Sequence, residues 1–317
     1  MKALRLGTRG SQLALWQART TARLVEQAGG PPCEIVVIKT SGDRLAEAPL
    51  SEVGGKRLFV KEIEDALLRG EIDFAVHSCK DMPAVLPDGL TIGAVLPRED
   101  PRDVVVLPAQ AKAPATLDEL RAALGPGRRI GTSSVRRIAE LAELFPGAAF
   151  VPIRGNLDTR LRKLDAGGAY DALVLAAAGM RRLGFSERMS FGLPLDACVP
   201  APGQGAIAIE RRAGDEATAA TLARIDDGPT AVAIEAERAL VAALGGGCQT
   251  PIGAVAVVEG GDLDLRAVVV SLDGSRVIRG RDRAPRAEAA ALGGRLAERL
   301  LAEGAGAILE DVRRAQS

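Results

Sequence analysis

The chain has 317 residues, of which 47% are hydrophobic and 26% charged, and its 41 Lys and Arg residues balance 41 Asp and Glu residues. Two or three domains are expected at this length, and the charge balance argues against nucleic-acid binding driven by net charge. No segment approaches the roughly 20 apolar residues of a membrane span. Arg5 and Arg9 interrupt the stretch where a signal peptide would be apolar, so we expect a cytoplasmic protein without a membrane partner.

Histidine and cysteine content narrows the possible chemistry. His77 is the only histidine, which excludes His-rich metal sites, so we expect no metal and read His77 itself as structural. The four cysteines, at positions 33, 79, 198 and 248, form no CxxC pair and are expected to be free thiols. Carboxylates, cations or thiols must therefore carry the chemistry.

Short β-branched runs alternate with helical patterns at the start of the chain, which predicts βαβ units and a mainly parallel sheet. Strands are expected at 2–7, 33–40 and 72–78. The first helix should begin after Ser11 as its N-cap, and a second helix should cover 57–70. The loop at 79–89 follows the third strand and is a candidate site.

The polar stretch "PREDPRD" at 97–103 predicts a crossing into a second βαβ series. Thr116 and Glu119 fit a capping box at the start of a helix. Three strand-to-helix passages follow, with strands inside 128–134, 149–156 and 170–180.

The pattern changes near the C-terminus, where a helix at 231–246 precedes strands at 252–259 and 263–280. The Asp-Gly pair at 273–274 predicts a hairpin, and a last helix near 286–303 completes an α+β unit.

Cations and small hydroxyl groups follow the predicted strands of the first two series. Because ligands of open α/β sheets bind at the carboxyl ends of the strands, where helix N-termini also attract anions, these residues predict a polyanionic ligand. Taken alone, each arginine is better read as a solvated surface residue, and only the repetition of arginines at corresponding strand ends supports the ligand reading. The residues are Arg9, Ser11, Lys80, Thr132, Ser133, Ser134, Arg136, Arg137, Arg154, Arg160, Arg181 and Arg182.

Two further residues are candidates for chemistry. Asp81 lies in the loop after an apolar strand, where a carboxylate can stabilise a cation or move a proton, although an Asx-turn explains it as well. Cys248 follows three glycines that would let a bulky group approach the backbone. Alternatively, Cys248 is a small buried side chain after a helix-capping glycine, and without a second histidine it has no Cys–His activation.

Nine segments, taken together and in order, resemble the porphobilinogen deaminase family over nearly the whole chain. They are "LGTRGSQLALWQ", "GGKRLFVKE", "AVHSCKDMP", "REDPRD", "GTSSVRR", "RGNLDTRL", "LAAAGMRRLG", "PAPGQGAIAIE" and "GGGCQTPIGA". The resemblance implies an α/β protein with two periplasmic-binding-protein-like βαβ lobes and a smaller C-terminal α+β domain. The expected domains are 1–96 with 196–217, then 97–195, then 218–317.

The resemblance also implies a transferase that joins four porphobilinogen molecules head to tail, releases ammonia at each step and yields hydroxymethylbilane for tetrapyrrole biosynthesis. A dipyrromethane cofactor would be held by Cys248 through a thioether, and Asp81 would be catalytic, stabilising the cationic azafulvene left when ammonia departs. Porphobilinogen would be the only partner of a monomer. By similarity, the cofactor would be bound by Lys80, Asp81, Thr132, Ser134, Arg136 and Arg137, and the substrate by Arg9, Ser11, Arg154, Arg160 and Arg182.

The chain departs from the family pattern at Arg57, where glycine is common, and at Cys79, where Met or Leu is usual. A thiol beside Lys80 predicts sensitivity to thiol reagents. A loop at about 42–57, with Lys56 and Phe59 near its end, is expected to help close the active site. Three alternatives stay open: a noncatalytic polycarboxylate- or anion-binding protein, a regulatory effector-binding module, and a transferase that loads Cys248 in each cycle.

Overall fold

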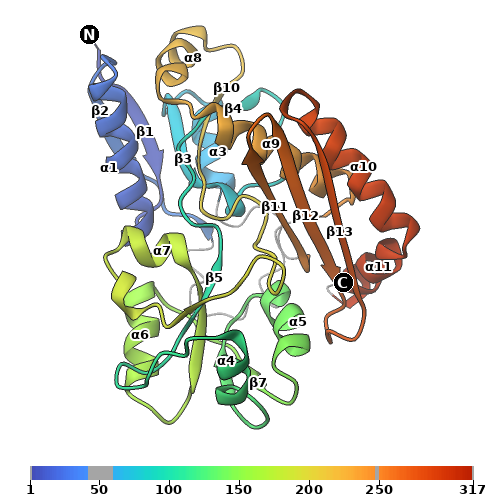
Figure 1. The fold of residues 1–317 in the computed structure, drawn as a ribbon. Helices are drawn as coiled ribbons and strands as arrows, with labels where there is room; N and C mark the ends of the chain where they lie inside the picture. The colour runs from blue at the N-terminus through green and yellow to red at the C-terminus, as the bar shows by residue number, and fades with distance from the viewer. Residues whose placement is uncertain (1, 42–59, 247–249, 316–317) are drawn as a thin grey trace.

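The computed structural model describes residues 2–41, 60–246 and 250–315, which form three sheets. Two sheets have five strands each and lie one above the other in Figure 1, and a three-stranded sheet lies beside them. We call the first five-stranded sheet with its helices lobe 1, the second with its helices lobe 2, and the three-stranded sheet with its helices the C-terminal domain. The α/β class with two lobes and a separate C-terminal α+β domain is thereby confirmed.

Lobe 1 has the strand order β2-β1-β3-β10-β4. Its central strand β3 is covered on both faces, as is typical of strands between two helical layers. Phe74 and Val76 pack toward α1, and Ala75 packs with Ile63 and Leu67 of α3. The elements are β1 (Leu4–Thr8), α1 (Gln12–Gln27), β2 (Cys33–Val37), α3 (Lys61–Leu68), β3 (Phe74–Ser78), β4 (Leu90–Val95), β10 (Ile207–Arg212), α8 (Glu216–Leu222) and the 3₁₀ turn η3 (Ala223–Ile225).

Lobe 2 has the strand order β7-β6-β8-β5-β9, so that its three parallel strands and its inserted antiparallel strand occupy the same places as in lobe 1. The elements are β5 (Asp103–Val106), α4 (Leu117–Ala123), β6 (Arg129–Gly131), α5 (Val135–Leu144), β7 (Ala149–Val151), α6 (Leu157–Asp165), β8 (Ala172–Ala176), α7 (Ala177–Arg182), the 3₁₀ turn η2 (Ser186–Arg188) and β9 (Phe191–Gly192).

The expectation of mainly parallel sheets is wrong for part of each lobe. Among the described residues, β10 runs antiparallel to β3 and β4, and β5 runs antiparallel to β8 and β9. Both strands are entered from a segment that crosses between the lobes, whereas the parallel strands β1, β3, β6 and β8 each belong to a strand–helix alternation. A strand that enters from the other lobe has no helical crossover to set its direction. Hydrophobic periodicity therefore could not predict that β5 and β10 run antiparallel.

Helix starts agree closely with the predicted caps. Ser11 Oγ accepts a hydrogen bond from the backbone N–H of Ala14 and caps α1. Thr116 Oγ1 accepts from the Glu119 N–H and caps α4, as predicted. The Glu119 carboxylate, however, accepts from the Ala115 N–H, one residue before the position that a standard capping box uses.

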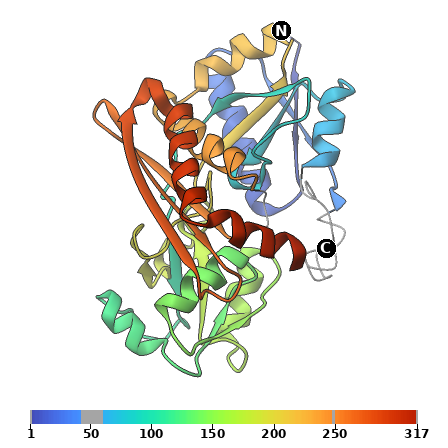
Figure 2. The same cartoon turned by 90° about the vertical axis from the view of Figure 1, so that its right-hand side faces the viewer.

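The C-terminal domain packs helices on one face of its sheet and lobe 2 on the other. Leu240, Leu265 and Leu296 belong to the helix-side core, and Val268 packs with Ala139 of α5 on the opposite side. Figure 2 shows α10 and α11 in red and dark red along this domain. The elements are α9 (Gly228–Ala243), β11 (Ile252–Glu259), β12 (Asp262–Val270), β13 (Val277–Pro285), the 3₁₀ turn η4 (Arg286–Glu288), α10 (Ala289–Ala302) and α11 (Ala305–Ala315).

The predicted hairpin is confirmed, because β12 and β13 pair antiparallel and Gly274 has a φ of +73° in the turn. Helix α11 was not predicted. It begins directly after Gly304, whose φ of +103° ends α10 and redirects the chain.

A buried ion pair ties the C-terminal domain to both segments that cross between the lobes. Arg98, in the first crossing, donates from Nη1 to Glu237 Oε1 of α9 at 2.5 Å. The other carboxylate oxygen of Glu237 accepts from the Gly203 N–H of the second crossing at 2.6 Å. Helix α9, which leads into the Cys248 segment, is therefore anchored at the junction of the lobes.

Candidate active site

The loop after β3 and the start of α1 form the lobe 1 side of the site. Arg9, Ser11, Gln17, Ser78 and Asp81 all line one small hollow of about 60 Å³. Asp81 ends a 3₁₀ turn, η1 (Cys79–Asp81), that directly follows the buried strand. The structure thus brings together the predicted residues Arg9, Ser11 and Asp81.

The hollow has groups of opposite charge on its walls. The N-terminus of α1, capped by Ser11, contributes partial positive charge beside the Arg9 guanidinium, and Asp81 contributes a carboxylate. Gln17 and Ser78 were not predicted as site residues. Their side chains hydrogen-bond each other at 2.9 Å and complete the polar lining.

Lys80 is the link between lobe 1 and lobe 2. Its Nζ donates to Gln204 Oε1 at 3.3 Å, and Gln204 Nε2 donates to Asp103 Oδ1 at 2.8 Å. Arg137 of α5 binds the same Asp103 oxygen from Nη2 at 2.7 Å. Burial, followed by the positive charge of Arg137, lowers the pKa of Lys80 to about 8, although the carboxylates of Asp81 and Asp103 partly oppose this. The nearby carboxylates therefore do not fully compensate the positive charge of Lys80, and a bound anion would stabilise it.

Gln204 and Asp103 are site residues that sequence reasoning missed as individual residues. Gln204 was part of the quoted segment "PAPGQGAIAIE", and Asp103 was read only as the end of the crossing. Gly203 and Gly205 on either side of Gln204 have φ values of +75° and +89°, and this backbone turns the amide toward both lobes. A polar residue between two such glycines is the signal that would have found it.

The predicted residues at the start of α5 have mainly internal partners. Thr132 Oγ1 accepts from the Ser134 N–H, and Ser134 Oγ caps α5 by accepting from the Arg137 N–H. Arg136 donates to Asp103 Oδ2 at 2.7 Å, to Glu140 Oε1 at 3.0 Å and to the carbonyl oxygen of Val199 at 2.7 Å. The Arg136 guanidinium therefore lies inside the buried network and not in the hollow beside Asp81.

Asp103 neutralises two buried guanidinium groups at once. Burial alone would raise its pKa, but the charges of Arg136 and Arg137 outweigh burial and hold the pKa well below the usual range of an aspartate. The same pairing, together with Glu140, raises the pKa of Arg136 above its usual value although burial opposes it.

Arg154 and Arg160 extend the positive surface in lobe 2. Arg160 donates from Nε to the carbonyl oxygen of Gly155 at 2.8 Å. Its pKa is lowered to about 10, first by burial and then by the positive charges of Arg137 and Arg154. Mutual repulsion among these three arginines indicates a site that favours a bound anion.

The neighbouring arginines at the end of α7 differ in their surroundings. Arg181 forms ion pairs with Glu99 and Asp100, each at 3.1 Å. Arg182 instead lies over the ring of Trp16 and donates to the carbonyl oxygen of Gly205. Of the two, Arg182 is the one that has no ion pair among the described residues, which suits its predicted role in binding a carboxylate.

Two residues near the site are structural. The Nε2 atom of His77 lies 3.1 Å from Glu210 Oε2, with both side chains buried, in line with the structural interpretation of His77. Cys79 is only 3% exposed, and burial raises its pKa to about 11. The expected reactivity of Cys79 toward thiol reagents is therefore wrong, because its thiol is both covered and protonated at neutral pH.

Cys248 lies outside the described residues, as do the loop at 42–57, Lys56 and Phe59. The structure does explain two of the three preceding glycines. Gly245 has a φ of +64°, its N–H donates to the Ala242 carbonyl, and the Gly246 N–H donates to the Val241 carbonyl, which is a Schellman motif ending α9. A Cβ atom on Gly246 would lie 2.5 Å from Ile252 Cδ1.

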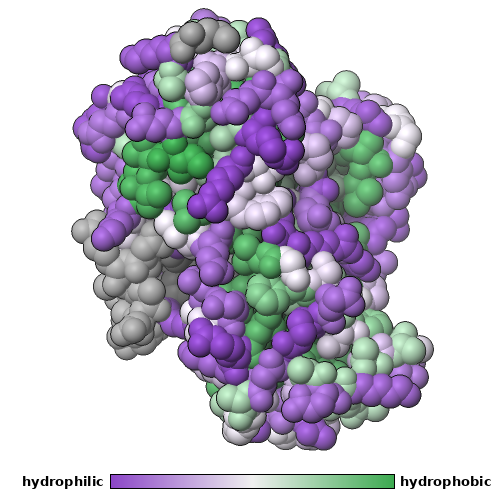
Figure 3. Space-filling model, turned by 90° about the vertical axis from the view of Figure 1, so that its left-hand side faces the viewer, coloured by the Kyte–Doolittle hydropathy of each residue, from purple (hydrophilic) through white to green (hydrophobic). Residues whose placement is uncertain are grey.

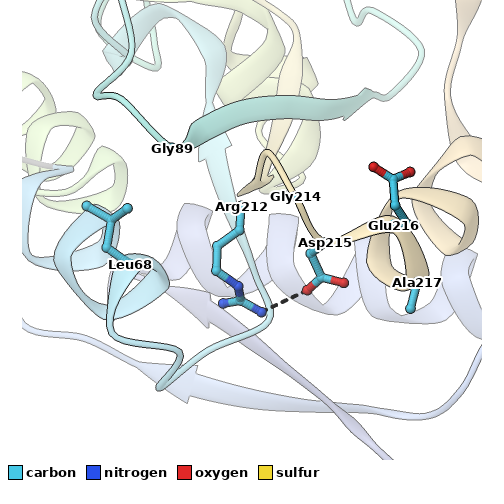
Figure 4. A pocket seen from close by; sticks show the side chains of 7 residues that line it. All are labelled: Leu68, Gly89, Arg212, Gly214, Asp215, Glu216 and Ala217. Carbon is cyan, nitrogen blue, oxygen red and sulfur yellow. Dashed lines mark hydrogen bonds and ion pairs between the residues drawn. The ribbon is translucent and has the colours of Figure 1, made fainter.

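A wider hollow at the edge of lobe 1 contains none of the predicted site residues (Figure 4). Its one cation, Arg212, donates to Asp215 Oδ2 at 2.8 Å and to the carbonyl oxygens of Leu67 and Ile72. With these partners Arg212 is not available for an anion, so we assign no function to this hollow.

In the part of the chain that the structure describes, no helix is long and apolar enough to cross a membrane.

Comparison of the sequence with known proteins identifies the family of this chain. Residues 4–220 match the family model "Porphobilinogen deaminase, dipyromethane cofactor binding domain", and residues 231–302 match "Porphobilinogen deaminase, C-terminal domain". Porphobilinogen deaminases from Trichlorobacter lovleyi and Moorella thermoacetica are 49% and 48% identical, over 98% and 99% of this chain and 97% of each relative. The porphobilinogen deaminase of Geotalea daltonii is 47% identical over 98% of this chain and 95% of its own.

Among solved structures, immunogenic lipoprotein A from Vibrio vulnificus is 14% identical, with a TM-score of 0.41 over 70% of this chain and 94% of that one. This likeness is too weak to support any conclusion about the fold beyond the sheet topology described above. The two family models and the full-length relatives, in contrast, cover both lobes and the C-terminal domain. The chain belongs to the porphobilinogen deaminase family.

Proposed function

We propose that this chain builds hydroxymethylbilane at the junction of its lobes, on a dipyrromethane that Cys248 holds through a thioether. Membership in the family makes hydroxymethylbilane synthesis from porphobilinogen the reaction of the chain, with dipyrromethane as its cofactor. The observation that supports the location is the set of mutually repelling cations contributed by both lobes, of which Arg137 is buried and Lys80, Arg154 and Arg160 are partly buried.

These cations fit the cofactor by charge. Each pyrrole ring carries an acetate and a propionate, so a dipyrromethane presents several carboxylates to a small volume. Lys80 and Arg137, with the hydroxyl groups of Thr132 and Ser134 at the start of α5, are the groups we propose for it. Because Arg136 already has three acceptors in the protein, we propose that it acts by holding Asp103, which in turn orients Arg137.

The hollow beside Asp81, at about 60 Å³, has room for one carboxylate group of the substrate. Arg9 and the N-terminus of α1 at Ser11 would hold a substrate carboxylate, and Arg154, Arg160 and Arg182 would bind further carboxylates as the chain of rings grows. When the aminomethyl group of porphobilinogen loses ammonia, positive charge develops on its pyrrole. A carboxylate fixed at the hollow lowers the free energy of that charge, which is the catalytic role we propose for Asp81.

The enzymatic reading is tested by incubating the purified protein with porphobilinogen. It is expected to release four ammonia molecules for each linear tetrapyrrole, whereas a noncatalytic anion-binding protein would bind the compound and release none. Arg160→Gln should raise KM by roughly 10-fold, because one carboxylate contact is lost. Arg162→Gln is the matched control, since Arg162 lies on the same helix and is exposed. Equal KM values for the two variants would contradict the placement of the substrate at this cluster.

We further infer three domains, with a first domain made of 1–96 and a second segment from 196, a second domain at 97–195, and a C-terminal domain, and a monomer that works in the cytoplasm. The expected boundary at 217 moves to about 225, because Leu222 and Ile225 pack in the core of lobe 1. Strand β10 supports the discontinuous first domain, because it pairs with β3 and β4 of lobe 1. The free thiols of Cys33, Cys79 and Cys198 suit a reducing compartment.

A further inference from the structure

Arg182 and Trp16 form a contact between the two lobes. Trp16 lies on α1 of lobe 1, and Arg182 is the last residue of α7 in lobe 2. The guanidinium carbon of Arg182 is 5.7 Å from the centroid of the Trp16 ring, within the range of a cation–π interaction. Figure 3 shows the side of the molecule that carries α1 and α7, where hydrophilic side chains surround separate apolar patches on both lobes. Trp16 is 36% exposed.

One edge of the Arg182 guanidinium is fixed by the backbone of the second crossing. Nη2 donates to the carbonyl oxygen of Gly205 at 2.6 Å, and the same oxygen accepts from the Glu99 N–H at 3.1 Å. Gly205 has a φ of +89°, and a Cβ atom there would lie 2.2 Å from the carbonyl oxygen of Glu99. The acceptor of Arg182 is thus held in a tightly packed turn.

The rest of the guanidinium has no acceptor among the residues that the structure describes. Burial lowers the pKa of Arg182 to about 10, which leaves it charged at neutral pH. The preceding residue, Arg181, has two carboxylate partners, Glu99 and Asp100. The Trp16 ring attracts the guanidinium through its face and accepts none of its in-plane N–H hydrogen bonds. The remaining N–H groups of Arg182 can therefore still donate to a ligand.

We propose that Trp16 is a positioning residue that stacks against Arg182 and keeps the open edge of its guanidinium ready for a carboxylate of the growing pyrrole chain. The identity of this ligand rests on the proposed function. Because Trp16 and Arg182 belong to different lobes, Arg182 is oriented only when the lobes adopt the arrangement seen in this structure.

The stacking itself is tested by fluorescence without any turnover. Trp16 is the only tryptophan in the chain, so its emission reports the cation over its ring. Arg182→Met keeps an unbranched stem and removes the charge, and it is expected to change the emission intensity or maximum of the substrate-free protein. Arg181→Met, one residue away, should leave the emission unchanged. Identical spectra for the unmodified protein and Arg182→Met would overturn the proposal.

The positioning role is tested by kinetics. Trp16→Leu is expected to raise KM for porphobilinogen roughly 3- to 10-fold with kcat within about 2-fold, and Trp16→Phe should restore most of the loss because it retains an aromatic face. In an Arg182→Met background, Trp16→Leu should add nothing further. A full additional effect in that background would contradict a role through Arg182. Failure of the unmodified protein to release ammonia would instead reject the proposed function, and the fluorescence comparison would still decide the stacking.

Discussion

Asp81→Asn is expected to lower kcat by about 100- to 1000-fold, with a much smaller change in KM. The asparagine side chain has nearly the same size, so the hollow lined by Arg9, Ser11 and Asp81 keeps its shape. What is lost is the negative charge that faces the positive charge developing on the pyrrole. Initial rates of ammonia release over a range of porphobilinogen concentrations measure both constants.

Asp88→Asn is the matched control for this experiment, because Asp88 is an exposed aspartate later in the same loop. It should behave like the unmodified protein. The intact mass of Asp81→Asn must show the same covalent group as the unmodified protein, which separates slow chemistry from failed cofactor assembly. A correctly loaded Asp81→Asn enzyme with kcat within 2-fold of normal would remove Asp81 from the mechanism.

Asp103→Asn is expected to lower the free energy of unfolding by about 3–5 kcal/mol, because it leaves buried positive charge without its partner. Asp103 is fully buried and lies 2.7 Å from both Arg136 Nη2 and Arg137 Nη2. In the variant, these two guanidinium groups would have only the Glu140 carboxylate, which contacts Arg136. Urea denaturation at pH 7 measures the difference.

The pH dependence of this difference has a definite sign. The pKa of Asp103 is held below its unfolded value, so the stability it contributes is present above the unfolded pKa of about 3.9 and is lost as pH falls toward the folded pKa. The gap between the unmodified protein and Asp103→Asn should therefore be present at neutral pH and narrow below about pH 4.

Asp196→Asn provides the comparison with an exposed pair, since Asp196 is 78% exposed and contacts Arg266 at 2.8 Å. Its expected cost is below about 1 kcal/mol. Equal stability losses for Asp103→Asn and Asp196→Asn would show that the buried network does not hold the junction together.

Local signals in the sequence predicted the parts of the fold that depend on neighbouring residues. Ser11 and Thr116 cap helices as predicted, and the Asp-Gly pair at 273–274 forms a hairpin turn. Directions of β5 and β10 were not predictable in this way, because these strands take their places from the two crossings between lobes. Periodicity within a strand carries no information about such distant pairing.

The same distinction between local signals and distant contacts applies to the candidate site. Lys80 and Arg137 were predicted as separate cations, and the structure joins them through Gln204 and Asp103, which come from the two crossing segments. Arg136 was predicted as a cofactor ligand on the strength of the motif alone. Its buried partners, Asp103 and Glu140, could be recognised only once α5 was packed against β5.

The intact mass of the purified protein tests the central claim most directly. The account predicts an excess equal to two linked pyrroles, located on the peptide that contains Cys248 and absent from Cys248→Ser, which should also fail to release ammonia from porphobilinogen. An unmodified Cys248 in a protein that still makes hydroxymethylbilane, or the same excess found on Cys33, Cys79 or Cys198, would contradict it.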